Sequence, residues 1–469
     1  MGANGHSERE PFRALLISTY EMGRQPFGLA SPAAWLRADG VEVECLDLSQ
    51  QRLDAAKVRQ AHLIAFYLPM HTATRIATAA IRRTRELNPR AHYCAYGLYA
   101  PMNEELLRQL GVSEIIGGEF EAALAETVRQ HHLETDSNAR STPGSRATRI
   151  SLDRQQFVLP HRAGLPALSS YAGLLMPDGS KRIVGYTEAS RGCKHLCRHC
   201  PIVPIYRGQF RIVQRDVVLE DIRQQVASGA QHITFGDPDF FNGPAHAIDL
   251  VGSLHHEFPG VSYDVTIKIE HLLQHAKYLP TLRDTGCAFV TSAVESLDDR
   301  VLDILQKGHT RAGFLRVVDL FERIGLVLAP TFVAFHPWTT LQSYREFLET
   351  IANLGLIEHV APVQLCLRLL IPSGSLMLEV PEIRPMLGGF DQVRLTYPWT
   401  HPDPRVDALQ ARLEKIVHEL SHRNAPRQAV FDQVWRAARA TLAGEDAFPP
   451  IPPLASRSTI PYLTEPWYC

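Results

Sequence analysis

The chain reads GYTEASRGCKHLCRHCP over residues 185–201. Residues 183–190 predict a β-strand, and Cys193, Cys197 and Cys200 follow it on one short loop in a C-x3-C-x2-C pattern. Thiolates are the usual ligands of iron–sulfur clusters, and a closed 4Fe-4S cluster takes four of them. Three thiolates on one loop therefore predict a 4Fe-4S cluster with one iron free of protein ligands, and we interpret this loop as the active centre.

Zinc is the main alternative for these cysteines. Structural zinc sites usually combine two pairs of Cys or His ligands. The cysteines outside the loop are all solitary, namely Cys45, Cys94, Cys287, Cys366 and Cys469. His195 and His199 lie inside the loop and could complete such a site. Cysteines with no common role are the second alternative.

The cysteine loop closely resembles the signature of the radical S-adenosylmethionine (SAM) superfamily. This resemblance implies that the open iron binds SAM through its amino and carboxylate groups. It also implies that an electron from the cluster, supplied by a donor such as flavodoxin or ferredoxin, cleaves SAM to a 5′-deoxyadenosyl radical. His199 stands where an aromatic residue is common in the superfamily, and its ring could pack near the adenine.

Length and composition predict a globular protein of two or three domains. The chain has 469 residues, of which 45% are hydrophobic and 21% charged. A net charge of −2 gives no basic surface for nucleic acid. Neither a signal peptide nor a long apolar run is evident, and the cysteines show no disulfide framework. We therefore expect a cytoplasmic protein without nucleic-acid or membrane partners.

Residues 11–135 predict a doubly wound, Rossmann-like α/β domain. Short apolar runs alternate with helical patterns, and the expected strands are residues 13–18, 41–46, 62–68, 92–96 and 113–116. Ligands of such domains lie beyond the carboxyl ends of the strands. The polar residues 136–150 are predicted to be a linker.

This domain resembles the cobalamin-binding domain that precedes many radical SAM domains. The resemblance lies in residues 26–43, in residues 95–99 and in the G-E-x-E pattern of residues 115–121. It implies a cobalamin bound near Gly97, Gly118 and Glu119. The loop after the first strand has no D-x-H-x-x-G histidine, so that axial ligand would be missing. The alternative is a domain that binds no cofactor and only packs on the barrel.

Residues 151–375 predict a lead-in followed by a partial (β/α)6 barrel, whose active site would lie at the carboxyl ends of its strands. The expected strands are residues 183–190, 232–235, 263–269, 288–295, 328–335 and 362–370. Each is separated from the next by one or two helical patterns. This alternation, with the resemblance above, predicts the radical SAM barrel.

Charged residues at three strand ends are predicted to bind SAM, following the superfamily. Asp237, and after it Asp239, is expected to accept hydrogen bonds from the amino group of SAM. Lys268 is expected to reach its carboxylate, and Glu295 to accept from its ribose hydroxyls. The alternatives are a helix-capping role for the aspartates and a solvated lysine.

The fifth and sixth strands carry further candidates. His336 replaces a glycine that is usual in the family and is expected to face the substrate. Arg368 is expected to bind a carboxylate of SAM or of the substrate. Cys366 would lie on the same strand face, where packing is the alternative to chemistry.

Residues 376–469 predict a helical extension, with helices at residues 406–421 and 428–443, and an apolar tail that docks. With the barrel segments, the tail resembles the radical SAM subgroup that ends in C-C-A-E-P or C-U-A-E-P, where U is selenocysteine. Cys469 would then be the first residue of a redox pair, and the gene would continue through a UGA codon. A thiol without a role is the alternative.

The sequence thus predicts a radical SAM enzyme that uses cobalamin to methylate an unactivated carbon of a small metabolite. A rearrangement, or transfer of another part of SAM, is the second reaction class. A redox or cobalamin sensor without turnover is the non-enzymatic alternative. His336, Cys366 and Cys469 are the candidate catalytic residues.

Overall fold

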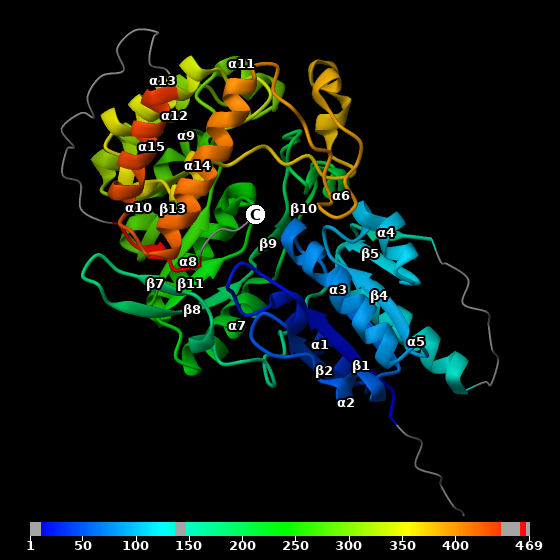
Figure 1. Ribbon diagram of the computed structural model, residues 1–469. Coiled ribbons are helices and arrows are strands. Elements are labelled where there is room, and N and C mark those ends of the chain that lie inside the picture. Colours follow the sequence, from blue (N-terminus) through cyan, green and yellow to red (C-terminus); the bar gives the residue numbers. More distant parts are fainter. Residues whose placement is uncertain (1–10, 137–146, 442–459, 466–469) are drawn as a thin grey trace, which may run out of the picture. The chain divides into compact units, whose positions relative to one another are not determined.

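The structure is a computed structural model that describes residues 11–136, 147–441 and 460–465 (Figure 1). The chain divides into two compact units, Met1–Pro166 and Ala167–Cys469. Among the described residues, every helix is too short or too polar to cross a bilayer.

The first unit is built on one parallel sheet with strand order β2-β1-β3-β4-β5-β6. Its strands are β1 (Arg13–Ser18), β2 (Glu42–Asp47), β3 (Leu63–Tyr67), β4 (His92–Tyr96), β5 (Glu114–Gly118) and β6 (Arg149–Ser151). The connecting helices are α1 (Phe27–Ala38), α2 (Ala55–Gln60), α3 (His71–Leu87), α4 (Glu104–Gln109) and α5 (Glu121–Asp136). The predicted doubly wound fold is confirmed.

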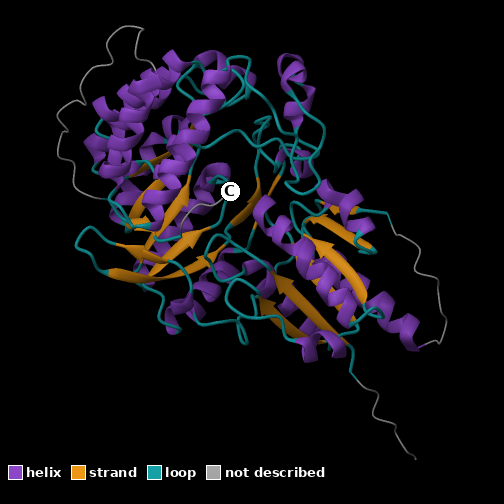
Figure 2. Ribbon diagram, in the orientation of Figure 1, coloured by secondary structure: helices purple, strands orange, loops and turns teal. Residues whose placement is uncertain are grey.

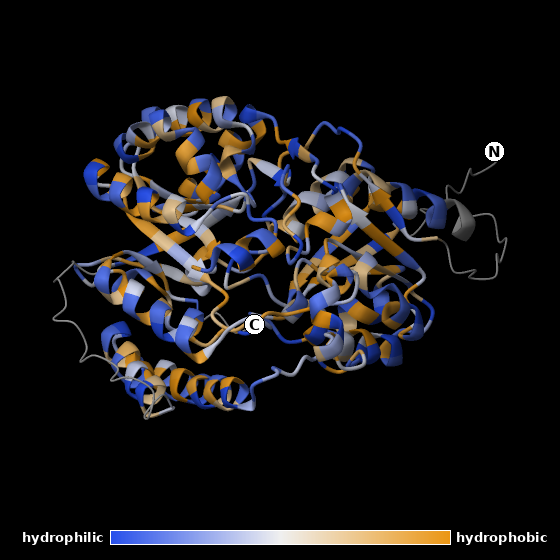
Figure 3. Ribbon diagram, turned by 90° about the horizontal axis from the view of Figure 1, so that it is seen from above, coloured by the Kyte–Doolittle hydropathy of each residue, from blue (hydrophilic) through white to orange (hydrophobic). Residues whose placement is uncertain are grey.

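Burial explains why these segments form strands. Every residue of β3 and of β5 is buried. Parallel strands are usually covered on both faces, so they read as continuous apolar runs. Figure 3 shows the strands mostly in the hydrophobic colour and the helices with mixed colours along their length, as expected when one side of a helix packs on a sheet.

The end of the first unit differs from the predicted division into a linker and a barrel lead-in. β6 pairs in parallel with β5, so the residues around position 150 belong to the first sheet. Beyond β6, His161 N donates to Ala30 O at 2.9 Å, and Gln25 Nε2 donates to Pro166 O at 2.9 Å. Residues 149–166 therefore complete the first unit, because β6 pairs with the otherwise free edge of β5.

The second unit contains a partial barrel and a helical extension (Figure 2). Its sheet has the order β14-β13-β12-β11-β8-β7-β15. The parallel strands are β8 (Lys181–Thr187), β11 (His232–Phe235), β12 (Ser262–Thr266), β13 (Cys287–Glu295) and β14 (Leu328–Phe332). β7 (Gly173–Leu175) pairs antiparallel with both β8 and β15 (Tyr462–Leu463).

Helices connect the strands of the barrel and follow it. Those of the barrel are α7 (Arg215–Ala227), α8 (Pro244–Glu257), α9 (Ile269–Gln274), α10 (Leu279–Asp284), α11 (Asp299–Ile304), α12 (Arg311–Ile324) and α13 (Leu341–Asn353). The extension consists of α14 (Pro404–His422) and α15 (Arg427–Thr441). Two helices, α9 and α10, connect β12 to β13, because Pro280 favours a new helix start.

The predicted sixth strand, residues 362–370, is wrong. The segment begins as a 3-10 turn, η6 (Pro362–Leu365), and its only β-pairing among the described residues is an isolated bridge between Arg368 and Phe335, which lies beyond the end of β14. Pro362 has no N–H to donate to a sheet. The side chain of Gln364 accepts a hydrogen bond from Phe332 N at 2.8 Å, in the place of a strand carbonyl.

Candidate functional site

The cysteine loop begins at a short hairpin beyond β8. β9 (Ser190–Gly192) pairs antiparallel with β10 (Phe210–Ile212). Gly192 has φ +72°, and a Cβ on it would lie 2.5 Å from Gln209 O. Cys193 N donates to the same carbonyl at 3.0 Å. Glycine therefore allows the close approach that fixes the start of the loop.

The three cysteines of the loop fit a cluster of iron and sulfide. Cys197 is buried, and Cys193 and Cys200 are half-buried. Burial raises the pKa of Cys193 to about 11 and that of Cys200 to about 12, and the charge of Cys197 adds to both shifts. The three thiols lie on one short loop, and a metal that binds thiolates would relieve the cost of ionising them there.

Asp239 holds the first half of the loop. Its Oδ1 accepts from Phe241 N at 3.1 Å, and its Oδ2 lies 2.7 Å from His271 Nδ1 and 3.5 Å from His195 Nε2. Burial alone would raise the pKa of Asp239, but the hydrogen bonds from His195 and His271 lower it. Ligand atoms of Cys193, His195 and Asp239 lie within 4.8 Å of one another, so they could also hold a metal ion.

Glu295 lies beside the second half of the loop. Its Oε1 is 3.1 Å from His199 Nε2 and 3.3 Å from Lys307 Nζ. Burial would raise the pKa of Glu295, but Lys307 and His199 outweigh it and lower the pKa to about 2. The carboxylate is therefore ionised at any pH near neutrality. Its predicted bond to the ribose of SAM stays a prediction.

Asp237 supports the strand that leads into the loop. Its carboxylate accepts from Ala189 N at 2.9 Å and from Ser190 Oγ at 2.5 Å. Burial raises the pKa of Asp237 to about 7, although both hydrogen bonds oppose the shift. The side chain therefore joins the end of β11 to the segment after β8. Its role toward SAM stays a prediction.

Lys268 lies beyond the end of β12, which stops at Thr266. It is the N-cap residue of α9, and its Nζ lies 3.2 Å from Glu270 Oε2. The side chain is 8% exposed, so the alternative of a solvated lysine is wrong. Its role toward the SAM carboxylate is untested.

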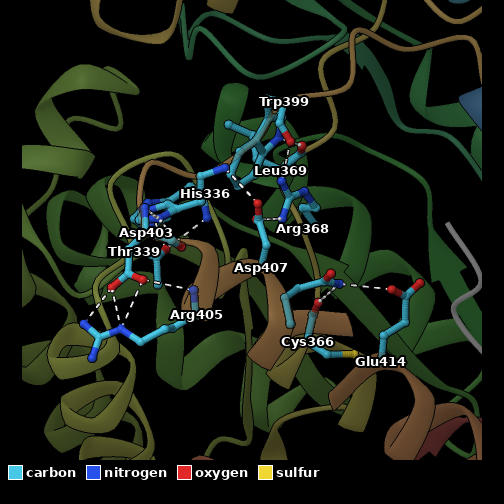
Figure 4. Close-up of polar contacts among 12 residues, drawn as sticks. His336, Thr339, Cys366, Arg368, Leu369, Trp399, Asp403, Arg405, Asp407 and Glu414 are labelled. Atoms are coloured by element: carbon cyan, nitrogen blue, oxygen red, sulfur yellow. Dashed lines mark hydrogen bonds and ion pairs between the residues drawn. The ribbon is translucent and has the colours of Figure 1, made fainter. Parts of the chain in front are cut away.

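Arg368 and Cys366 lie where the barrel meets the extension (Figure 4). Arg368 Nη1 donates to Asp407 Oδ1 at 2.7 Å, and Nη2 donates to the carbonyl of Trp399, whose ring centre lies 3.4 Å from the guanidinium carbon. Cys366 Sγ lies 3.4 Å from Val363 O, and burial raises its pKa to about 12. The arginine joins barrel to helix α14, and the thiol packs in a protonated form.

His336 is buried in the segment that follows β14, the fifth parallel strand of the barrel. Its Nδ1 lies 3.2 Å from Thr339 Oγ1, and its Nε2 lies 3.5 Å from Ser296 Oγ. Burial lowers the pKa of His336 to about 4, so the imidazole is neutral at neutral pH. It lines a cavity of about 120 Å³ together with Glu295, Ser296, Asp298 and Arg311. The predicted contact of His336 with substrate is untested.

The glycines predicted to lie near cobalamin are required by the chain itself. Gly97 has φ +108°, and a Cβ would lie 2.9 Å from Leu68 O. Gly118 has φ +73°, and a Cβ would lie 2.1 Å from Ser151 O. The buried side chain of Glu119 accepts a hydrogen bond from Gln155 Nε2 at 3.3 Å. These residues lie at the carboxyl ends of the strands, as predicted, but their contacts need no cofactor.

The tail docks on the barrel sheet through β15. Thr464 N donates to Gly173 O at 2.9 Å, and Arg427 lies 4.4 Å from the ring centre of Tyr462. Cys469 lies outside the described residues, so its redox role and the C-C-A-E-P or C-U-A-E-P tail stay predictions.

Sequence reasoning missed the residues that hold the loop from other segments. Arg198 N donates to Leu305 O at 3.0 Å, and Lys307 and His271 bind the two carboxylates described above. Lys307 stands between Gln306 and Gly308 in the short segment after α11, which carries no motif that could have identified it. Nothing local distinguishes His271 from the other histidines.

A comparison with family models matches residues 187–352 to the Radical SAM superfamily. The ribosomal protein uS12 methylthiotransferase RimO of Parabacteroides distasonis is 26% identical over 189 residues, which are 37% of this chain and 42% of the relative. The tRNA-2-methylthio-N(6)-dimethylallyladenosine synthase of Herpetosiphon aurantiacus is 24% identical over 185 residues, 35% of this chain and 39% of the relative. The chain thus matches less than half the length of these relatives.

Two solved structures resemble the chain over most of its length. The cobalamin-dependent SAM radical enzyme OxsB with aqua-cobalamin bound has a TM-score of 0.65 at 12% identity and covers 91% of this chain and 72% of that one. The radical SAM methyltransferase TsrM of Kitasatospora setae, with cobalamin and a [4Fe-4S] cluster bound, has a TM-score of 0.56 at 18% identity over 74% of this chain and 73% of that one. At these identities the likeness shows the fold.

Proposed function

We propose that this chain is a radical SAM enzyme that methylates an unactivated carbon of a small metabolite with the help of cobalamin, because residues 187–352 match the Radical SAM superfamily. The observation that carries the proposal is that three free thiols, Cys193, Cys197 and Cys200, lie on one short loop beyond β8. The reaction would take place in the cytoplasm, with an electron donor such as flavodoxin or ferredoxin.

The three cysteines would hold a 4Fe-4S cluster with SAM at its fourth iron. When bound, the cluster supplies the electron that cleaves SAM, and cobalamin supplies a methyl group. The chain itself contributes position and charge. Asp239 and Glu295 hold the histidines between the cysteines, and both carboxyls have a lowered pKa, so they stay ionised during turnover.

The cavity beside Glu295 is our candidate for the substrate-binding site of the barrel. His336 would serve there as a neutral hydrogen-bonding group, since burial lowers its pKa to about 4. Arg311 and Asp298 in the same lining offer charges of both signs to a polar ligand. We assign His336 to substrate contact on this basis.

Cobalamin would bind at the carboxyl ends of the strands in the first unit, near Gly97, Gly118 and Glu119. The support is the doubly wound fold, whose ligands lie at that edge. The names of OxsB and TsrM report cobalamin in proteins of the same fold.

Transfer of a different group from SAM is the second candidate reaction. It is favoured by the two sequence relatives, whose names describe methylthio transfer to a ribosomal protein and to tRNA. Isotope-labelled SAM distinguishes the two reactions, because a product that gains only a labelled methyl group supports methylation and one that also gains sulfur contradicts it.

The proposal is tested with protein reconstituted with iron and sulfide under anaerobic conditions and then given SAM and dithionite. We expect iron, its thiolate charge-transfer absorption and 5′-deoxyadenosine. Replacing Cys193, Cys197 and Cys200 together by Ala should abolish all three. Cys45→Ala is the matched control, because Cys45 lies on β2 of the other unit. Iron binding without cleavage of SAM would favour a redox sensor, and zinc in place of iron would contradict the proposal.

A further inference from the structure

We propose that Glu295 is a positioning residue for the cysteine loop, which it holds from the end of β13 through His199 and Lys307. This inference rests on the proposed cluster at the three cysteines. It assigns the Glu295 carboxylate to the loop, whereas the sequence suggested the ribose of SAM.

Two donors, one 96 residues and the other 12 residues from Glu295 in the chain, contact one oxygen of its carboxylate. His199 Nε2 lies 3.1 Å from Oε1, and Lys307 Nζ lies 3.3 Å from the same atom. The side chains are 14%, 11% and 4% exposed for His199, Glu295 and Lys307. Little water competes for these contacts, so each is stronger than it would be on the surface. His199 is the residue before the third cysteine, so its position limits where Cys200 can lie.

The backbone of Glu295 is shaped to aim this side chain. Glu295 has φ +68°, a conformation that is uncommon for residues other than glycine. The pairing of β13 with β14 shifts register between Ala293 and Glu295, and Val333 N donates to Glu295 O at 2.9 Å. Irregular pairing of this kind redirects a side chain near functional sites. A strained backbone of this kind persists only where surrounding contacts determine it.

The segment that carries Lys307 also holds the loop by its backbone. Arg198 N donates to Leu305 O at 3.0 Å, and Arg198 Nη1 donates to Ile304 O at 2.9 Å. The cysteine loop, the end of β13 and the segment after α11 are thus joined by one set of hydrogen bonds and ion pairs.

The test compares Glu295→Gln with Glu257→Gln in full-length protein reconstituted with iron and sulfide. Glu257, on α8, forms an exposed ion pair with Arg223 of α7, 2.6 Å away, so it is a matched control for loss of a carboxylate. We expect Glu295→Gln to release iron to a chelator about tenfold faster than wild type, as is typical when groups that orient metal ligands are removed. The electron paramagnetic resonance signal of its reduced cluster should also change. Glu257→Gln should match wild type in both.

His199→Gln separates positioning from general loss of stability. It should release iron faster in the same way, and combining it with Glu295→Gln should add little, because both changes break one contact. It also keeps the inference testable if Glu295→Gln fails to fold.

Wild-type iron release and an unchanged signal in Glu295→Gln, with weaker SAM binding, would assign the carboxylate to SAM and overturn the inference. A wild-type protein that takes up no iron would instead overturn the proposed function.

Discussion

The carboxyl ends of the strands carry different kinds of residue in the two units. After β11 and at the end of β13, the barrel places buried carboxylates, Asp237, Asp239 and Glu295, which bind the segment carrying the cysteines. At β4 and β5, the first unit places Gly97 and Gly118, where a side chain would collide with a neighbouring carbonyl. The same topological position thus holds charged contacts in one unit and close backbone packing in the other.

This difference limits what an acidic residue or a glycine at a strand end indicates about function. Burying a carboxylate costs free energy unless a donor or cation pairs with it. A buried acidic residue at a strand end therefore already uses some of its hydrogen-bonding positions for contacts within the protein. A glycine with positive φ can be required by the backbone alone. Neither residue type at a strand end is sufficient to identify a cofactor site.

Among the strand-end residues, we expect the largest effect on the free energy of unfolding from Asp237 of the barrel. Its pKa is raised from 3.8 to about 7 in the folded protein, so the folded state holds a proton that the unfolded state releases. The corresponding stability is fully present below about pH 4 and is lost as the pH rises to about 7. Relative to Asp237→Asn, wild type should lose up to roughly 4 kcal/mol of unfolding free energy between pH 4 and pH 8.

Denaturant unfolding at matched cluster loading measures this loss. His336→Gln is a control, because the contribution of His336 to stability should change with pH in the opposite direction. The pKa of His336 is lowered to about 4, so its contribution grows as the pH rises from about 4 toward 6.5. Parallel pH profiles of wild type and Asp237→Asn would show that Asp237 is ionised in the folded protein.

In the first unit, we expect Gly118→Ala to cause a smaller loss in the free energy of unfolding. The new Cβ would lie 2.1 Å from Ser151 O, so β5 and β6 must separate. We expect a loss of about 3 kcal/mol, which combines backbone strain with the clash. Gly40→Ala is the control, because Gly40 also has positive φ, +78°, but has nothing within 4 Å of the added Cβ. It should cost only about 1 kcal/mol.

Thermal unfolding of the protein without added cobalamin measures both variants. Equal stability losses for Gly118→Ala and Gly40→Ala would mean that close packing on β6 is not the reason for glycine. Cobalamin affinity would then become the next measurement.

The smallest effect is expected for Arg368→Lys. Lysine cannot reproduce both the contact with Asp407 and the stacking on Trp399, so we expect a loss of about 1 kcal/mol in unfolding free energy. SAM affinity should be unchanged, and Asp407→Asn should reproduce the loss. A large drop in SAM affinity with unchanged stability would support the predicted role of Arg368 toward SAM, and equilibrium dialysis with labelled SAM makes that comparison.

Much of the fold could be predicted because it is encoded locally. The predicted strands over residues 13–18, 92–96 and 232–235 agree with β1, β4 and β11 residue by residue. Continuous apolar runs identify such strands wherever a sheet is covered on both faces. The prediction failed at residues 362–370, where a proline and a side chain that replaces a backbone partner prevented the apolar alternation from forming a strand.

The sequence by itself determined the cysteine loop, the alternation of strands and helices and the strand ends at which charged residues collect. These depend on spacing and periodicity within a few residues. Only the tertiary structure decided which partner each charge has, since Glu295 meets a histidine 96 residues away and Arg368 meets an aspartate 39 residues away. Such pairs depend on how the strands and helices pack, and no local pattern in the chain records them.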